Sequence, residues 1–164
     1  MISINTMKKN FLTVLSVLIV TVATAQEVKW YSIEEAVVLN SKEPKKMMID
    51  VYTTWCGWCK VMDKNTFNDA GVASYLNTKF YSVKLNAEQK ESISIGDKTF
   101  NYVTVGNRGY NELAVYLLQG QMGFPSIVFL DEDGKLIERH QGYKDAKTFS
   151  DLMKHIGEEK YKTQ

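Results

Sequence analysis

The two cysteines of the chain, Cys56 and Cys59, lie in the segment Trp55-Cys56-Gly57-Trp58-Cys59-Lys60. Two thiols separated by two residues can close a small disulfide ring and reopen it by thiol–disulfide exchange. An apolar run at residues 47–52 precedes them and helical spacing starts at Cys56, which predicts a buried strand followed by a helix. Unpaired backbone N–H groups and the helix dipole favour a thiolate at a helix N-terminus, and lowering the thiol pKa from about 8.5 to about 7 stabilises it by about 2 kcal/mol. We therefore expect Cys56 to be a nucleophile at neutral pH.

Three other uses of a C-x-x-C pair fit the sequence less well. A zinc site needs a second pair of ligands, and the two histidines, His140 and His155, lack the spacing of such a site. Covalent haem attachment needs a histidine directly after the second cysteine, where Lys60 stands. A purely structural disulfide remains an alternative, but so short a loop constrains the unfolded chain little. Redox chemistry without a metal or other cofactor is the favoured interpretation.

The first 25 residues have the pattern of a secretory signal peptide. Lys8 and Lys9 form a basic region, residues 11–22 are uncharged and mostly apolar, and residues 23–25 are small enough for a signal peptidase site. A transmembrane anchor is the alternative, but it needs an apolar run of about 20 residues, whereas this run has about a dozen. We therefore expect cleavage after residue 25 and a periplasmic or secreted protein.

The remaining residues, 26–164, suit a single domain with one core. Without Lys8 and Lys9 the chain carries 18 basic and 19 acidic residues, a balance that argues against nucleic-acid binding. We expect a monomer with no membrane span after cleavage. In an oxidising compartment the two thiols would be oxidised, so a reducing role requires a partner that delivers electrons.

Apolar spacing and turn signals divide this part of the chain into helices and strands. Ser32 and Glu35 have the form of a capping box, and Asp69 that of a helix N-cap. Residues 47–52 are apolar on both faces, as in a central strand, except at Asp50, where an acid is unexpected. In order, the pattern predicts helix 33–40, strand 47–52, helix 56–66, a helical turn after Asp69 through residue 76, strand 80–85, a hairpin at 92–100, helix 111–119, a hairpin of strands 126–130 and 135–140, and helix 145–159. This order predicts an α/β fold, with a central mixed sheet flanked by helices on both faces.

These residues resemble the thioredoxin family over nearly all of the chain that follows the predicted signal. Residues 55–62 match the W-C-x-x-C-K-x-M pattern of exported thioredoxin-like proteins. Asp50 matches the family's buried acid on the strand before the active site, and Lys84 matches the lysine on the following strand. Residues 123–126, Gly-Phe-Pro-Ser, match the cis-proline loop, and Gly142 matches the glycine of the last strand-to-helix connection. Separated matches in this order are far more specific than the C-x-x-C pair alone.

The resemblance implies a thioredoxin fold and a role for each matched residue. Cys56 would attack a substrate disulfide, and Cys59 would resolve the resulting mixed disulfide. Asp50, with a pKa raised by desolvation, would take the proton from Cys59, and Lys84 would pair with Asp50 and moderate that shift. Pro125 would be cis and would place backbone groups beside the thiols for an extended substrate peptide.

The substrate-binding surface is expected to comprise the rim residues Trp55 and Trp58, Gly57 between the cysteines, and the loop of Phe124 and Pro125. Other interpretations stay open: a hydrated strand end for Asp50, a solvated side chain for Lys84, an ordinary turn for Pro125, and packing on the domain for either tryptophan.

Two departures from the family pattern limit the resemblance. Gly57-Trp58 stands where cytosolic thioredoxins have Gly-Pro and where oxidases and isomerases carry a histidine second, so we expect a less oxidising pair than in the periplasmic oxidases. The stretch between Lys84 and Pro125 is longer by about twenty residues than in a minimal thioredoxin, which predicts an insertion before the cis-proline loop, at residues 87–107. A role in partner choice and a tolerated surface loop are equally open for it.

Together these features predict an exported thiol-disulfide oxidoreductase that reduces or isomerises disulfides in other exported proteins. The redox-active Cys56–Cys59 disulfide would take the place of a cofactor, and a thiol reductant in the membrane would supply electrons. Two alternatives remain: a net disulfide oxidase, and a non-enzymatic binding module that holds a partner in the groove around Trp55, Trp58 and Pro125.

Overall fold

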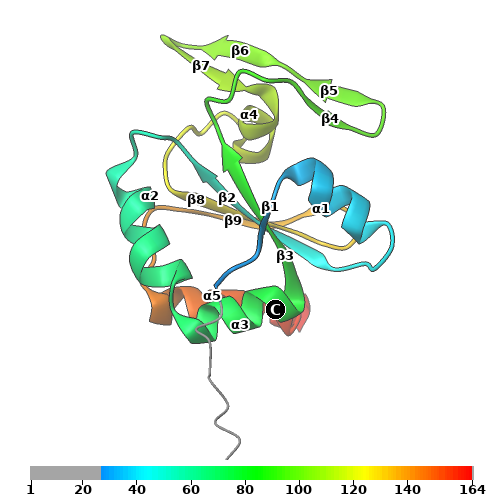
Figure 1. Ribbon diagram of the computed structural model, residues 1–164, viewed down its shortest axis with the longest axis vertical. Helices are drawn as coiled ribbons and strands as arrows, with labels where there is room; N and C mark the ends of the chain where they lie inside the picture. The colour runs from blue at the N-terminus through cyan, green and yellow to red at the C-terminus, as the bar shows by residue number, and fades with distance from the viewer. Residues whose placement is uncertain (1–26, 164) are drawn as a thin grey trace, which may run out of the picture.

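The computed structural model describes residues 27–163, so the predicted signal peptide and its cleavage site lie outside the described residues. A five-stranded sheet with the strand order β1-β3-β2-β8-β9 forms the centre of the domain (Figure 1). β3 pairs in parallel with β1 and β2, whereas β8 pairs antiparallel with β2 and β9, so the predicted mixed sheet is confirmed. The strands are β1 (Trp30–Tyr31), β2 (Lys46–Tyr52), β3 (Phe80–Asn86), β8 (Ser126–Leu130) and β9 (Leu136–Gln141).

Helices cover both faces of this sheet (Figure 1). α1 (Ile33–Asn40) and α4 (Glu112–Leu118) lie on one face, and α3 (Ala70–Lys79) and α5 (Ala146–Gly157) lie on the other. The predicted helix 56–66 is two elements, α2 (Gly57–Met62) and a π-helical turn, η1 (Asp63–Phe67), and a short 3-10 turn, η2 (Lys160–Thr163), follows α5. Among residues 27–163, no helix is long and apolar enough to cross a membrane.

The helix starts are where the sequence predicts them, because side chains satisfy the first backbone N–H groups. Ser32 and Glu35 form both hydrogen bonds of the capping box at α1. The side chain of Asp69 accepts from Val72 N at 2.9 Å and begins α3. Asp145 accepts from Thr148 N at 2.7 Å and begins α5. These caps set the ends of the helices that pack on the sheet.

The chain between β3 and α4 forms two hairpins, where the sequence predicts one. The predicted hairpin is present as β4 (Ile93–Ile95) and β5 (Lys98–Phe100). A second hairpin, β6 (Tyr102–Val105) and β7 (Arg108–Asn111), follows it and is not predicted. The predicted insertion, residues 87–107, ends inside the turn of the second hairpin, and residues 87–111, which hold both hairpins, are here called the insertion.

Alternating side chains of β2 build a separate hydrophobic cluster on each face of the sheet. Met47, Ile49 and Val51 belong to the cluster under α1 and α4. Met48 belongs to the cluster that α5 covers. The α5 residues in this cluster, Phe149, Met153 and Ile156, have the spacing predicted for one face of an amphipathic helix. Asp50 follows Met48 by two residues and shares its face, so the strand directs a carboxyl group into the second cluster.

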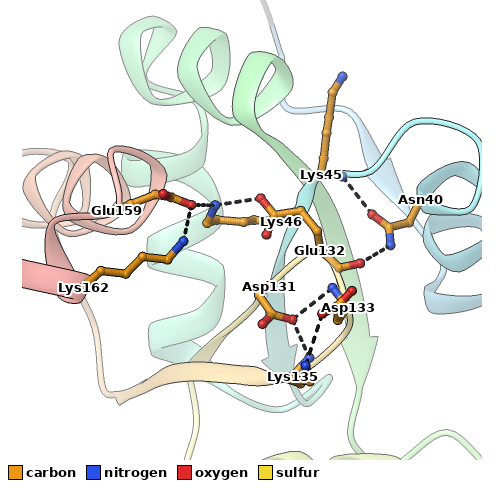
Figure 2. A network of polar contacts seen from close by, with 9 residues as sticks. All are labelled: Asn40, Lys45, Lys46, Asp131, Glu132, Asp133, Lys135, Glu159 and Lys162. Carbon is orange, nitrogen blue, oxygen red and sulfur yellow. Dashed lines mark hydrogen bonds and ion pairs between the residues drawn. The ribbon is translucent and has the colours of Figure 1, made fainter.

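A polar network fixes the first residue of β2 at the far end of the strand from the cysteines (Figure 2). Lys46 is only 6% exposed, and its Nζ lies 2.7 Å from Glu132 Oε1 and 2.9 Å from Glu159 Oε1. Asn40 donates to the Glu132 carbonyl at 2.7 Å and accepts from Lys45 N at 2.8 Å. The network thereby ties β2 to the β8–β9 turn and to the segment after α5.

We expect the substitution Phe149→Ala to lower the free energy of unfolding by about 3–5 kcal/mol, because it empties a fully buried position between α5 and the sheet. Urea titration of the oxidised protein measures this loss. The matched control Tyr116→Ala, at a side chain that is 71% exposed on α4, should stay within about 0.5 kcal/mol of the parent. Equal losses in the two variants would contradict the assignment of α5 to the core.

Candidate active site

Cys56 and Cys59 form a disulfide at the start of α2, with their Cα atoms 5.3 Å apart. Cys56 is the N-cap residue of the helix, as the sequence predicts, and its Sγ accepts a hydrogen bond from Cys59 N at 3.1 Å. The same N–H group is available to a thiolate after reduction, and charge-assisted hydrogen bonds are the stronger kind. Cys56 is 4% exposed and Cys59 is 2% exposed, so the first cysteine is slightly the more accessible of the two.

A tight turn between β2 and α2 places Cys56 at this position. Cys56 N donates to the carbonyl of Thr53 at 3.2 Å, which closes the turn directly after the strand. Thr53 is itself buried, whereas Trp55 in the same turn is exposed. Gly57 is the first residue of α2 and is also exposed, and a Cβ added to it would meet no atom within 4 Å. The turn thus buries the backbone beneath the disulfide and leaves the side chains around it accessible.

Asp50 and Lys84 are direct neighbours across the parallel pair β2–β3. Lys84 Nζ lies 2.6 Å from Asp50 Oδ2, and the Asp50 side chain is only 2% exposed. Burial raises the pKa of Asp50 from 3.8 to about 6, although the Lys84 ammonium acts in the opposite direction. The predicted shift and the predicted ion pair are therefore both present. Within residues 27–163, the second carboxyl oxygen of Asp50 has no hydrogen-bond partner.

Asp63 is a member of this ion-pair network that sequence reasoning missed. It follows Cys59 by four residues, which places both on one side of the helical segment, and its carboxylate pairs with Lys84 from the other side. Burial alone would lower the pKa of Lys84, but Asp50 and Asp63 outweigh it and raise that pKa. The charge of Asp63 also contributes to the raised pKa of Asp50. The spacing of four from Cys59 was the signal that could have identified it.

Lys84 connects the buried Asp50 to the protein surface. Its ammonium lies over the rings of Trp30, Tyr52 and Phe67, at 4.8, 5.1 and 5.4 Å from their centroids. An open cavity of about 290 Å³ lies beside it, with Asp63 and Lys84 in its lining. Through Lys84 and Asp63, the buried Asp50 is thus linked by ion pairs to the lining of an open cavity.

The loop before β8 contains a cis peptide bond between Phe124 and Pro125, as predicted. Gly142 N donates to the Pro125 carbonyl at 2.8 Å, and Ser126 Oγ donates to the Gly123 carbonyl at 2.7 Å. Gly142 has a φ of +90°, a backbone conformation that favours glycine. The last connection of the chain therefore supports the cis-proline loop from behind. Pro125 is buried and Phe124 is half-buried.

Two exposed tryptophans flank the disulfide, as the sequence predicts for a binding rim. Trp55 is 53% exposed and contacts Phe124 edge-on, with ring centroids 6.0 Å apart. Trp58 is 61% exposed, and its ring centroid lies 5.3 Å from that of Tyr143. Each indole rests on one aromatic neighbour and keeps a large apolar surface in solvent. Exposed aromatic side chains of this kind suit contacts with peptide substrates.

Within the described residues, no cluster of three or more His, Cys, Asp or Glu side chains has a geometry that could hold a metal ion.

One protein-family model matches nearly the whole chain. The family model described as "Thioredox_DsbH: Protein of unknown function, DUF255" matches residues 9–163. The thiol:disulfide interchange protein DsbD of Photorhabdus laumondii is 29% identical over 129 residues, which cover 77% of this chain and 19% of that protein. DsbD of Pectobacterium atrosepticum is 32% identical over 116 residues, covering 68% of this chain and 17% of that protein. The chain thus spans less than a fifth of the length of these relatives.

Solved structures show the same fold. A putative disulphide-isomerase from Bacteroides thetaiotaomicron is 27% identical, with a TM-score of 0.58 over 84% of this chain and 98% of the other. A DsbH oxidoreductase is 18% identical, with a TM-score of 0.59 over 82% of this chain and 87% of the other. The thioredoxin fold predicted from the resemblance is confirmed.

We expect Asp50 to make stability depend on pH. Because its folded pKa of about 6 lies above its ordinary 3.8, its contribution to stability is fully present below about pH 4 and is lost as the pH rises through 6. The difference corresponds to about 3 kcal/mol. Urea titrations of Asp50→Asn and the parent, both oxidised, should agree near pH 4 and diverge by about 2–3 kcal/mol at pH 7.5, with the variant more stable. A difference that is constant between these pH values would contradict this assignment.

Proposed function

The chain belongs to the thioredoxin-like DsbH family, DUF255, and from this premise we propose that it is a thiol-disulfide oxidoreductase that reduces or isomerises disulfides in other proteins. The observation that carries the proposal is the Cys56 sulfur at the N-cap of α2, where it accepts a hydrogen bond from Cys59 N, and a buried carboxyl group on β2, the strand that runs into this helix, supports it. A structural bridge needs neither the helix N-terminus nor a proton acceptor with a pKa near neutrality.

The reaction consists of two exchanges. In the first, the Cys56 thiolate attacks one sulfur of a substrate disulfide, and the other substrate sulfur leaves as a thiolate and takes a proton. In the second, Cys59 loses its proton to Asp50 and attacks the Cys56 sulfur, which releases the second substrate thiolate. Two electrons pass to the substrate, and the protein ends with the Cys56–Cys59 disulfide. A dithiol donor must then reduce that disulfide for another turnover.

We further propose that the chain acts outside the cytoplasm and receives its electrons from a thiol reductant in the membrane. The pattern of Lys8, Lys9 and the apolar residues 11–22 supports export, and an exported dithiol needs a source of electrons. The similarity to part of DsbD, a thiol:disulfide interchange protein, supports a partner of the same chemistry. Residues 26–164 form the working domain of this proposal.

We expect Cys56→Ser to abolish disulfide reduction, because no thiolate remains to begin the first exchange. Cys59→Ser should complete the first exchange only, and the mixed disulfide should accumulate, because its resolving thiol is missing. Insulin reduction with dithiothreitol measures turnover, and non-reducing electrophoresis with mass spectrometry detects the trapped species. Asp50→Asn should leave the first exchange unchanged and slow resolution on the order of 10²-fold. A parent protein that binds partners without turnover would instead support a binding module.

The direction of the reaction depends on the reduction potential of the pair. We expect a potential below about −200 mV, toward the reducing thioredoxins, because no histidine lies between the cysteines to stabilise the thiolate. Equilibration with glutathione buffers, followed by alkylation and mass spectrometry, measures it. The matched variant Trp58→His should be more oxidising by tens of millivolts, where about 30 mV equals about 1.4 kcal/mol. A parent value near −120 mV would favour a net oxidase.

A further inference from the structure

Two charged residues from the chain between β3 and α4 hold the indole of Trp55. Its Nε1 donates to both carboxylate oxygens of Glu88, each at 2.9 Å. The guanidinium of Arg108, the first residue of β7, lies over the indole ring at 4.7 Å from its centroid. Trp55 directly precedes Cys56, so the insertion contributes two residues to the rim of the site.

The hairpin that carries Arg108 is anchored to the sheet. Asn111, at the end of β7, is fully buried, and its backbone N donates to the Ala87 carbonyl at 2.7 Å. Ala87 N in turn donates to the carbonyl of Tyr52, the last residue of β2, at 2.8 Å. Tyr110 is 5% exposed and contacts the ring of Phe124, with centroids 6.1 Å apart. The second hairpin lies at the end of the sheet from which β2 runs into α2 (Figure 1), and these contacts anchor the strand that places Arg108 over Trp55, the residue before Cys56.

Arg108 is exposed, and its guanidinium contacts the face of the Trp55 ring. In the part of the chain that the structure describes, no carboxylate lies within ion-pair distance of it, and Glu88 is occupied by the indole N–H. A guanidinium stacked on an aromatic ring keeps its edge N–H groups free, and those groups match the two oxygens of a carboxylate. The rim therefore presents a positioned cation to any peptide that reaches Cys56.

We propose that Arg108 is a specificity residue that selects substrates with an aspartate or glutamate beside the disulfide under attack, an inference that rests on the proposed function. The substrate carboxylate binds the guanidinium edge while its cysteine approaches the Cys56 sulfur. An exposed ion pair of this kind changes a rate by about two- to fivefold, and salt weakens it because the Debye length is about 8 Å at 0.15 M.

Two disulfide peptides that differ only by glutamate or lysine next to the attacked cysteine test this inference. The second-order rate constant for the reaction of each peptide with the reduced protein is measured by stopped flow at low salt. The parent should react about two- to fivefold faster with the glutamate peptide. Arg108→Gln should lose the preference, and Arg108→Glu should reverse it. The control Lys98→Glu, a charge reversal on the first hairpin, should keep it.

Circular dichroism and thermal melting verify that the variants fold. Preference for neither peptide in the parent, or equal rate changes for both peptides in Arg108→Glu, would overturn the inference and leave the proposed function intact. No reaction of the parent with either peptide would overturn the proposed function, and this inference with it. A preference that persists in 0.5 M salt would also exclude an exposed ion pair as its cause.

Discussion

The site depends on one constraint, the placing of a carboxyl group inside an apolar sheet. The parallel register of β2 and β3 sets Asp50 opposite Lys84, and the alternation of side chains directs both to one face. The Lys84 ammonium stabilises the Asp50 carboxylate. It lies among three aromatic rings and also pairs with Asp63. Burial nevertheless prevails and brings the Asp50 pKa to about 6. The free energy gained by burying the two hydrophobic clusters must offset the cost of holding a carboxylate inside the sheet.

The same sheet brings the other parts of the site together. Val51 pairs with Ser126 across β2 and β8, so the cis bond before Pro125 lies next to the end of β2. One turn later the chain reaches Cys56, which the helix start holds through Cys59 N. Asp50, the disulfide and the cis-proline loop are thus all set by the pairing of one central strand with its two neighbours.

The features that the sequence predicted correctly are those set by residues close together in the chain. The caps of α1, α3 and α5, the strand at β2 and the cis-proline loop rest on residues close in the chain, and the structure has them where the patterns indicate. β1 is too short for any periodicity. The second hairpin does carry a signal that the prediction overlooked, because Val103 and Val105 alternate with Thr104 before the turn residues Gly106 and Asn107. The contacts of Trp55 with Glu88 and Arg108 join residues 33 and 53 positions apart, and only the folded hairpins bring them together. The only sequence signal for the pairing of Asp63 with Lys84 was its spacing of four residues from Cys59.

In the proposed mechanism, the residues that perform the exchange and those that face a partner come from different parts of the fold. Cys56, Cys59, Asp50 and Lys84 are held by the sheet and by α2, whereas Glu88 and Arg108 come from the insertion. The Cys56 sulfur is almost covered, whereas Trp55 and Trp58 are exposed, so in this proposal a substrate contacts the tryptophans as it approaches the sulfur. The rate of exchange then depends on rim contacts as well as on thiolate chemistry. Changes in the hairpin can therefore alter which disulfides react without altering the potential of the pair, because the groups that stabilise the thiolate lie in a different part of the fold.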